Sequence, residues 1–361
     1  MADYEKLLKL RPEHAAKNLG SKSKVCLLSS RDIFRVLRGD KLIVMACNAR
    51  MTHNIPGLMR AAKDLDAIIG FEMAKSESDL SGGYTGFTPQ IYFNAIIEYA
   101  EREKFGQPFF IHADHTTVKD TSEKAIKSAR ELNAEQLRVG YTSFSIDASF
   151  NQLPDNIRIT SQLAKPLMEY NIGLEVEVGE ILSLKKGGHI STVEEALEMV
   201  DGVQANGIKP NLLATNNGSV HGNYKPGEDV HIDLKRTGEI YEAIKGKGVD
   251  IAQHGITGTP LNLVGQFADY GIRKGNVATQ WQNITHECLP KDLEDTIQNW
   301  CKKEGKDLKE ATKPFKKEID SIPKEYAEKI VEKTREVAKE FILAFRAKDS
   351  APKVAERLLK G

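Results

Sequence analysis

The chain has 361 residues, of which 40% are hydrophobic and 28% charged, a composition typical of a globular protein with a substantial core. Basic and acidic residues balance at 51 each, so the formal charge of zero excludes a general attraction to nucleic acid or to an anionic membrane. The four cysteines are widely spaced, which argues against a thiolate metal site and a disulfide framework. The sequence has no apolar signal core near Met1 and no long apolar run, so we expect a cytoplasmic protein without a membrane span.

The order of apolar and amphipathic segments predicts the fold. Residues 1–40 read as a helical preface, and from Leu42 apolar runs alternate with segments of helical period. Eight strands alternating with helices predict an α/β fold, a (β/α)8 TIM barrel, whereas the alternative of a doubly wound sheet seldom needs eight strands. The predicted strands are Leu42–Cys47, Ala67–Phe71, Phe109–Ile111, a stretch between Leu137 and Ile146, Gly173–Val178, Asn211–Ala214, Asp250–Ala252 and Ile272–Val277. The predicted helices are Ile55–Leu65, Pro89–Glu103, Thr121–Leu132, Ile157–Tyr170, Thr192–Ala205, Ile232–Ile244 and Pro260–Tyr270.

The sequence changes character after Trp281, where lysine and glutamate become frequent. We expect one domain over 1–361, with a barrel core at about 42–281 and a C-terminal helical extension at 282–361. Apolar residues in this extension recur at spacings of four or seven, which marks one face of a helix. That face predicts either packing against the barrel or a contact with another subunit. Its members are Tyr326, Ile330, Val337, Phe341 and Phe345.

The stretch Pro108–Asp120 has the highest concentration of residues that can act as metal ligands or as catalytic acids and bases. Phe109–Ile111 reads as a buried strand, and His112, Asp114 and His115 follow within four residues. In a parallel barrel such strand ends point to the mouth where active sites lie. The alternative is a polar turn whose histidines only cap and hydrogen-bond. Because neighbours on a strand point to opposite sides, Asp114 and His115 both face the site only if the chain turns there, and we predict that it does.

Polar residues also follow the other predicted strands. His115, His221 and His254 each follow a strand, so we expect them to converge at the mouth, although three unrelated surface histidines are the alternative. Three imidazoles with an open fourth position form a catalytic zinc site. Alternation places Glu175 and Glu177 on one face of the fifth strand, where one of them can instead form an ion pair inside the barrel. Glycine-rich turns after the seventh and eighth strands predict a phosphate site, with plain tight turns as the alternative.

These motifs, in this order, resemble the class II, zinc-dependent fructose-1,6-bisphosphate aldolase family. The resemblance spans roughly Leu42 to Trp281. Its parts are His-Ala-Asp-His at 112–115, Thr142–Asp147, Leu-Glu-Val-Glu-Val-Gly at 174–179, Gly218–Tyr224 with Lys225-Pro226-Gly227, His254-Gly255, and Asn-Val-Ala-Thr at 276–279.

The resemblance implies reversible cleavage of fructose 1,6-bisphosphate into dihydroxyacetone phosphate and glyceraldehyde 3-phosphate. It implies that His115, His221 and His254 bind Zn²⁺ or another divalent ion, and that Asp114 exchanges the proton of the C4 hydroxyl. Asp147 and Glu177 resemble the family's second metal position. The implied partners are a sugar phosphate and a second copy of the chain, in a homodimer or larger homo-oligomer. The implied substrate-binding residues are Asn48, Gly222, Lys225, Gly255, Thr257, Asn276, Val277, Ala278 and Thr279, and a monovalent cation (Na⁺ or K⁺) is implied at Val220, Gly222 and Gly255.

The sequence departs from the family pattern in two motifs, and its tail beyond Trp281 matches the family poorly. The family favours His-Gly-Gly-Ser-Gly where this chain has Ile256 and Thr257, and we expect the branched side chain of Ile256 to crowd the phosphate turn. The family places a base for the ketone fragment in the loop after the fifth strand, where Glu180 is the nearest candidate.

Alternative functions remain open from the sequence. The substrate can be another ketose phosphate, such as tagatose 1,6-bisphosphate or a less phosphorylated ketose. A metal-dependent hydrolase on the same barrel is a second candidate, although such enzymes commonly carry a His-x-His pair where this first strand ends Cys47-Asn48-Ala49-Arg50. A catalytically silent barrel that serves in binding or assembly is the third.

Overall fold

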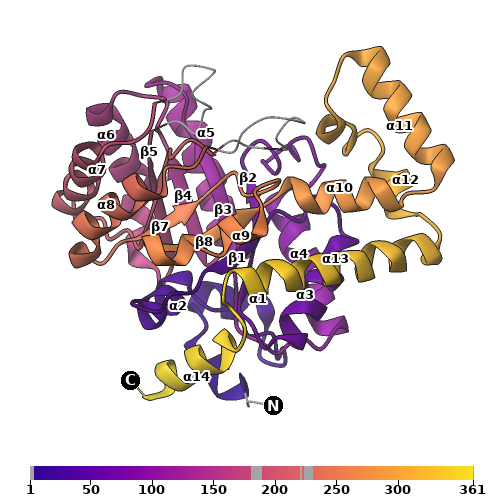
Figure 1. Ribbon diagram of the computed structural model, residues 1–361, viewed down its shortest axis with the longest axis horizontal. Helices are drawn as coiled ribbons and strands as arrows, with labels where there is room; N and C mark the ends of the chain where they lie inside the picture. The colour runs from indigo at the N-terminus through magenta and orange to yellow at the C-terminus, as the bar shows by residue number, and fades with distance from the viewer. Residues whose placement is uncertain (1–3, 180–188, 220–221, 223–230, 361) are drawn as a thin grey trace.

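The computed structural model of the chain describes residues 4–179, 189–219, 222 and 231–360 (Figure 1). Four of the candidate site residues lie outside the described residues: Glu180, Val220, His221 and Lys225.

Eight parallel strands close into a barrel in the order β1 to β8, which confirms the (β/α)8 fold and excludes the doubly wound alternative. The strands are rich in buried apolar residues because helices cover the sheet from outside. Strands β5 and β8 have the predicted bounds, whereas β3 continues to Thr117 rather than ending at Ile111. The strands are β1 Val44–Cys47, β2 Ile69–Ala74, β3 Phe109–Thr117, β4 Ser143–Asp147, β5 Gly173–Val178, β6 Leu212–Thr215, β7 Asp250–Gln253 and β8 Ile272–Val277.

Helices connect successive strands on the outside of the barrel. Several begin at a side chain that accepts a backbone N–H of the first turn, as Thr88, Ser122 and Thr192 do for α4, α5 and α7. None of the described helices is both long enough and apolar enough to cross a bilayer. The connecting helices are α3 Asn54–Asp64, α4 Pro89–Arg102, α5 Glu123–Val139, α6 Leu153–Ala164, η2 Lys165–Glu169, α7 Val193–Ala205, α8 Leu234–Ile244, η4 Lys245–Lys247, α9 Leu261–Val264, η5 Phe267–Tyr270 and α10 Thr279–Cys288.

The two ends of the chain close the bottom of the barrel, where the strands begin. The predicted preface forms η1 (Tyr4–Leu10), α1 (Glu13–Leu19) and α2 (Ser30–Leu37), and the chain ends with α14 (Ser350–Lys360). Apolar residues of η1, α2 and α14 form one buried cluster with inward-facing strand residues. Figure 1 shows η1 and α14 side by side below the barrel. Packing at the bottom therefore stabilises the barrel, and a functional site is expected at the opposite end, where the strands finish.

The C-terminal extension consists of α11 (Lys291–Glu304), η6 (Leu308–Ala311), α12 (Lys316–Asp320) and α13 (Lys324–Ala344), ahead of α14. Its long helix α13 packs against α3 and α10. Ile330 and Phe341 are buried there, and the Phe341 ring lies 6.1 Å from that of Trp281. The apolar face predicted from the sequence therefore covers the barrel, so it is wrong to assign this face to a contact with another subunit.

Candidate metal and catalytic site

A bulge in β3 brings two neighbouring side chains to the barrel mouth. The pairing of β3 with β4 shifts between Ala113 and Thr116, where β3 holds one residue more than its partner. His115 within this bulge has φ 39°, a left-handed conformation that is uncommon for a residue with a side chain. The turn expected from the sequence is therefore present, and Asp114 and His115 lie on the same side of the strand.

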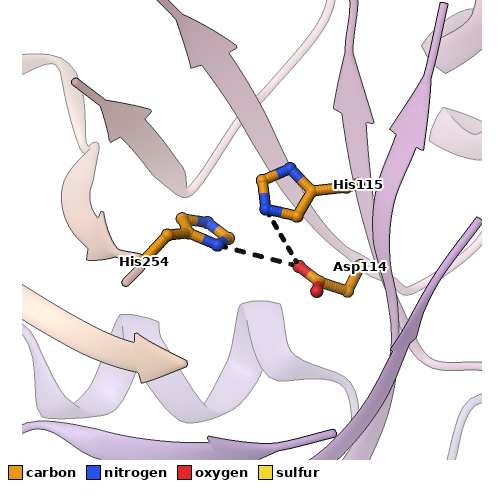
Figure 2. Close-up of side chains that lie close together, drawn as sticks. All are labelled: Asp114, His115 and His254. Carbon is orange, nitrogen blue, oxygen red and sulfur yellow. Dashed lines mark ion pairs between the residues drawn. The ribbon is translucent and has the colours of Figure 1, made fainter. Parts of the chain in front are cut away.

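His254, which follows β7, completes a cluster with these two residues (Figure 2). Nε2 of His115 lies 3.9 Å from Oδ1 of Asp114, and Nδ1 of His254 lies 4.0 Å from the same oxygen. One ligand atom from each of the three residues lies within 4.8 Å of the others. Two imidazole nitrogens thus point at one small volume beside a carboxylate.

The outer nitrogen of each imidazole is held by a glutamate of β5. Nδ1 of His115 lies 2.6 Å from Oε1 of Glu177, and Nε2 of His254 lies 2.8 Å from Oε1 of Glu175. A carboxylate accepts, so each outer nitrogen donates, and in the neutral imidazole that a metal ion requires the inner nitrogen then has the lone pair for the ligand bond. Carboxylate–histidine pairs of this kind orient the imidazole ligands of metal sites. The described residues therefore fit a divalent ion held by His115 and His254.

The charges around His115 favour a cation. Asp147 Oδ2 lies 3.6 Å from Nδ1 of His115, so Asp114, Asp147 and Glu177 surround one imidazole. Burial raises the pKa of Glu177 to about 8, and Asp147 adds to this rise. Burial opposes protonation of His115, but Glu177 and Asp114 outweigh it and raise the pKa of His115 well above its usual range. A metal ion at this place would balance carboxylates that now repel one another.

Below the mouth, the barrel interior holds an ion-pair network that the sequence predicted only in part. Lys274 of β8 is fully buried, and its Nζ lies 2.9 Å from Glu175 and 3.1 Å from Glu72. Burial raises the pKa of Glu72 well above its usual range, although Lys274 opposes this. Glu175 is thus the inward-facing ion-pair residue that alternation allowed, and it links Lys274 to His254. A lysine within the apolar run of β8 is the sequence feature that could have predicted this network.

Asp114 is fixed by two amides from neighbouring strands. Nδ2 of Asn48, after β1, donates to its Oδ2 at 3.0 Å, and Nδ2 of Asn276 in β8 donates to its Oδ1 at 3.1 Å. Burial favours the neutral acid, but His115 and His254 outweigh it and hold the pKa of Asp114 below its usual range. Asp114 is therefore an ionised, oriented carboxylate. Asn48 and Asn276, expected to bind substrate, lie against this carboxylate.

The turns after β7 and β8 border the same cavity, which has a volume of about 1100 Å³. Gly255 and Gly258 have φ of 68° and 84°, values that favour glycine. Helix α10 begins at Thr279 on the cavity wall, and Thr257 Oγ1 accepts the Gln280 N–H of its first turn at 3.3 Å, so the positive end of the helix and a hydroxyl lie together where an anion could bind. Gly222, Gly255, Thr257, Asn276, Ala278 and Thr279 all border the cavity, whereas Val277 is buried beside it.

Ile256 does not crowd this turn as expected. It is 1% exposed, and a Cβ added to Gly275 would meet Cδ1 of Ile256 at 3.0 Å and the Phe345 ring at 2.8 Å. The tip of the side chain therefore packs on the helix-facing side of β8, although the residue also borders the cavity.

The cavity also includes residues that the sequence analysis did not select. Glu77 and Arg50 form a buried ion pair at 2.6 Å beside Asn48. Asp307, Leu308 and Lys309 of the C-terminal extension reach the cavity wall. The link is a hydrogen bond from Lys313 N to Tyr84 O at 3.0 Å, which joins the extension to the segment between β2 and α4. Neither feature has a local sequence signal, because each depends on contacts between distant segments.

Comparison with known proteins shows the family to which the chain belongs. A family model described as "Fructose-bisphosphate aldolase class-II" matches residues 28–350. A fructose-bisphosphate aldolase from Streptococcus pneumoniae serotype 4 is 25% identical over 262 residues, covering 72% of this chain and 80% of that protein. A fructose-bisphosphate aldolase from Giardia intestinalis is 24% identical over 269 residues, covering 72% and 75%.

Solved structures share the fold at lower sequence identity. The fructose-bisphosphate aldolase from Campylobacter jejuni has a TM-score of 0.65 at 16% identity, covering 90% of this chain and 97% of that one. The YdjI aldolase from Escherichia coli K12 has a TM-score of 0.63 at 17% identity, covering 90% and 99%. At these identities the likeness establishes the barrel fold alone.

Proposed function

Because the chain belongs to the class II fructose-bisphosphate aldolase family, we propose that it is a metal-dependent aldolase that reversibly cleaves fructose 1,6-bisphosphate. The observation that carries the proposal is the convergence of His115 Nε2 and His254 Nδ1 on Asp114, with each outer nitrogen engaged by a glutamate. A divalent ion held there, with His221 as the proposed third ligand, would supply Lewis acidity at the C2 carbonyl of a ketose phosphate.

Asp114 is the proposed base for cleavage. Its ionised carboxylate takes the proton of the C4 hydroxyl while the C3–C4 bond breaks, the aldehyde leaves and the bond electrons remain on the ketone fragment. In the reverse direction the protonated Asp114 returns this proton to the aldehyde oxygen. We propose Glu180 as the separate base that exchanges the α-proton of the ketone fragment.

The turns at Gly255–Thr257 and Asn276–Thr279 are the proposed site for the phosphate of the ketone fragment, with Gly222 and Lys225 beside it. Backbone N–H groups at the start of α10 suit an anion, and Thr257 and Thr279 add hydroxyls. Asp147 and Glu177 are the proposed second position of the metal ion. A monovalent cation at Val220, Gly222 and Gly255 completes the proposal, as the family resemblance implies.

The metal is tested by comparing His254→Ala with His189→Ala, a histidine that is exposed and outside the cavity. After dialysis against buffer without chelator, the parent and His189→Ala should retain about one divalent ion per chain. His254→Ala should lose the ion and the cleavage activity while its circular dichroism stays unchanged. Full metal occupancy in His254→Ala would contradict the assignment.

The reaction is tested with a panel of ketose phosphates in a coupled assay that detects the released aldehyde and ketone. Cleavage should be fastest with fructose 1,6-bisphosphate, should stop with chelator and should return with zinc. Preference for tagatose 1,6-bisphosphate or a singly phosphorylated ketose would support an aldolase activity but show that fructose 1,6-bisphosphate is not its substrate. Absence of carbon–carbon cleavage across the panel would refute the proposed function.

We further propose a homodimer or larger homo-oligomer acting in the cytoplasm, on the family resemblance. Because the apolar face of α13 covers the barrel, the subunit contact must use another surface. Light scattering at micromolar concentration would measure the mass, and a monomer would contradict this proposal.

A further inference from the structure

Glu77 is a buried carboxylate with every acceptor position engaged. It lies after β2 and is 3% exposed. Its Oε1 accepts from Arg50 Nε at 2.6 Å and from Tyr84 OH at 3.0 Å. Its Oε2 accepts from Ala74 N and from Asn48 Nδ2, both at 2.9 Å. A carboxylate offers about four lone-pair sites, so Glu77 has little capacity left to bind a substrate. It acts on other protein groups.

Asn48 connects Glu77 to the proposed base. Its Nδ2 donates to Glu77 at 2.9 Å and to Asp114 at 3.0 Å, which uses both amide hydrogens. Two carboxylates on one side determine which end of the amide faces them, because only the nitrogen can donate. Its Oδ1 is buried and has no hydrogen-bond partner among the described residues. The orientation of Asn48 therefore depends on Glu77, and that of Asp114 depends in part on Asn48.

The positive partner of Glu77 is equally constrained. Arg50 is 9% exposed, donates through Nη1 to Gln282 at 2.9 Å, and lies 5.8 Å from the centre of the Tyr84 ring. A buried ion pair gains little net stability, because desolvation of both charges offsets their attraction. What this pair provides is a fixed geometry at Asn48, next to Asp114.

We propose that Glu77 is a positioning residue that holds Asn48, and through it Asp114, in the orientation required at the C4 hydroxyl. This inference rests on the proposed function, because it needs Asp114 to act as the cleavage base. It predicts that Glu77 matters for breaking the C3–C4 bond and not for exchange of the α-proton of the ketone fragment, which uses another base.

The decisive variant is Glu77→Gln, which keeps the shape and replaces one oxygen by NH₂. Whichever way the amide turns, this NH₂ faces donors, either Arg50 with Tyr84 or Ala74 with Asn48, so the array cannot persist. The cleavage kcat should fall by about 10²-fold, the effect of misplacing a reacting group by about 1 Å. The metal content should equal that of the parent, and α-proton exchange and KM should change by less than about threefold.

Two comparisons separate positioning from general damage. Tyr84→Phe removes one bond to Oε1 and leaves the link to Asn48, so it should lose far less cleavage activity than Glu77→Gln. Asn48→Ala should reproduce the Glu77→Gln phenotype, and the double variant should be no worse than either single one, because both break one chain of contacts. Equal loss of cleavage and exchange in Glu77→Gln, or equal losses in Tyr84→Phe and Glu77→Gln, would overturn the proposal.

A structural readout keeps the test independent of the proposed reaction. Crystal structures of the parent and Glu77→Gln should differ in the orientation of Asn48 and of the Asp114 carboxylate. If the parent cleaves no ketose phosphate, the proposed function fails, yet this comparison still decides the positioning role. An Asp114 carboxylate that keeps its place and its bond to Asn48 in Glu77→Gln would refute it.

Discussion

Asp114 accepts an amide hydrogen on each carboxylate oxygen, from Asn48 and Asn276, and lies about as far from Nε2 of His115 as from Nδ1 of His254. The two amides fix the plane of the carboxylate without supplying a proton, because amides do not titrate in the accessible range. The imidazoles favour its charged form. A base that must be ionised before it takes a proton needs this combination of orientation and charge.

Replacement of Asp114 by Asn tests its role directly. Asp114→Asn keeps the size of the side chain and loses the base, so cleavage should fall by about 10²-fold or more while metal and ketose phosphate still bind. Exchange of the α-proton of the ketone fragment should survive better than cleavage, since another base serves it. Asp120→Asn, an exposed change in the loop after β3, is the matched control and should behave as the parent. Cleavage near the parent rate, or loss of the metal, would show that the assigned role is wrong.

Among the elements, β3 and β5 determine the site. Alternation along β5 sends Glu175 and Glu177 to the same side, which could be predicted from the sequence, whereas the contact of each with one imidazole could not. The turn at Asp114 and His115 was predicted, but its form as a bulge was not, because a bulge depends on the pairing of β3 with β4. The ion pair between Arg50 and Glu77 could not be predicted, because the two residues lie on different segments and neither belongs to a local motif.

The outer side of β8 also shows the limit of sequence reasoning. Ile256 stands in a turn expected to bind phosphate, and a motif comparison alone places its side chain there. In the structure the side chain fills the layer between β8 and the end of α13, beside Gly275 and Phe345. The volume of the Ile256 side chain therefore affects the packing between β8 and α13. The barrel fold could be predicted from the sequence, but the direction of this side chain could not.

Gly275→Ala tests how closely this layer is packed. The added methyl would meet Phe345 at 2.8 Å, Ile256 at 3.0 Å and Ile43 at 3.1 Å, so the variant should lose about 1–3 kcal/mol of unfolding free energy. Gly106→Ala is the control, because nothing lies within 4 Å of its added Cβ. Urea unfolding of both variants measures the difference. Equal stabilities would mean that the layer rearranges without cost.

Across the whole molecule, the C-terminal extension joins the two ends of the barrel. Lys309 reaches the cavity wall at the open end, α13 runs along α3, and α14 closes the bottom beside η1 (Figure 1). From the sequence this extension was only a charged helical segment, because its contacts with the barrel are with residues distant in the sequence. We infer from these contacts that residues 1–361 fold as one domain.

The ion pair between Asp269 in η5 and Arg346 after α13 ties this extension to the barrel, and it predicts a pH dependence. Arg346 holds both oxygens of Asp269, at 2.7 and 3.0 Å, and Lys41 adds a second cation at 3.3 Å. Arg346 thereby lowers the pKa of Asp269 to about 2 from its usual 3.8. A carboxylate whose pKa is lower in the folded state stabilises the fold above its unfolded pKa, and this contribution is lost as the pH falls from about 4 towards 2.

Because the pair is largely exposed, water screens it, and Asp269→Asn should cost only about 0.5 kcal/mol at neutral pH and less in high salt. Urea unfolding of parent and variant should show a constant difference between pH 7 and 5 that shrinks below pH 4. A difference that persists unchanged at pH 3 would mean that the aspartate stabilises the junction by packing rather than by charge.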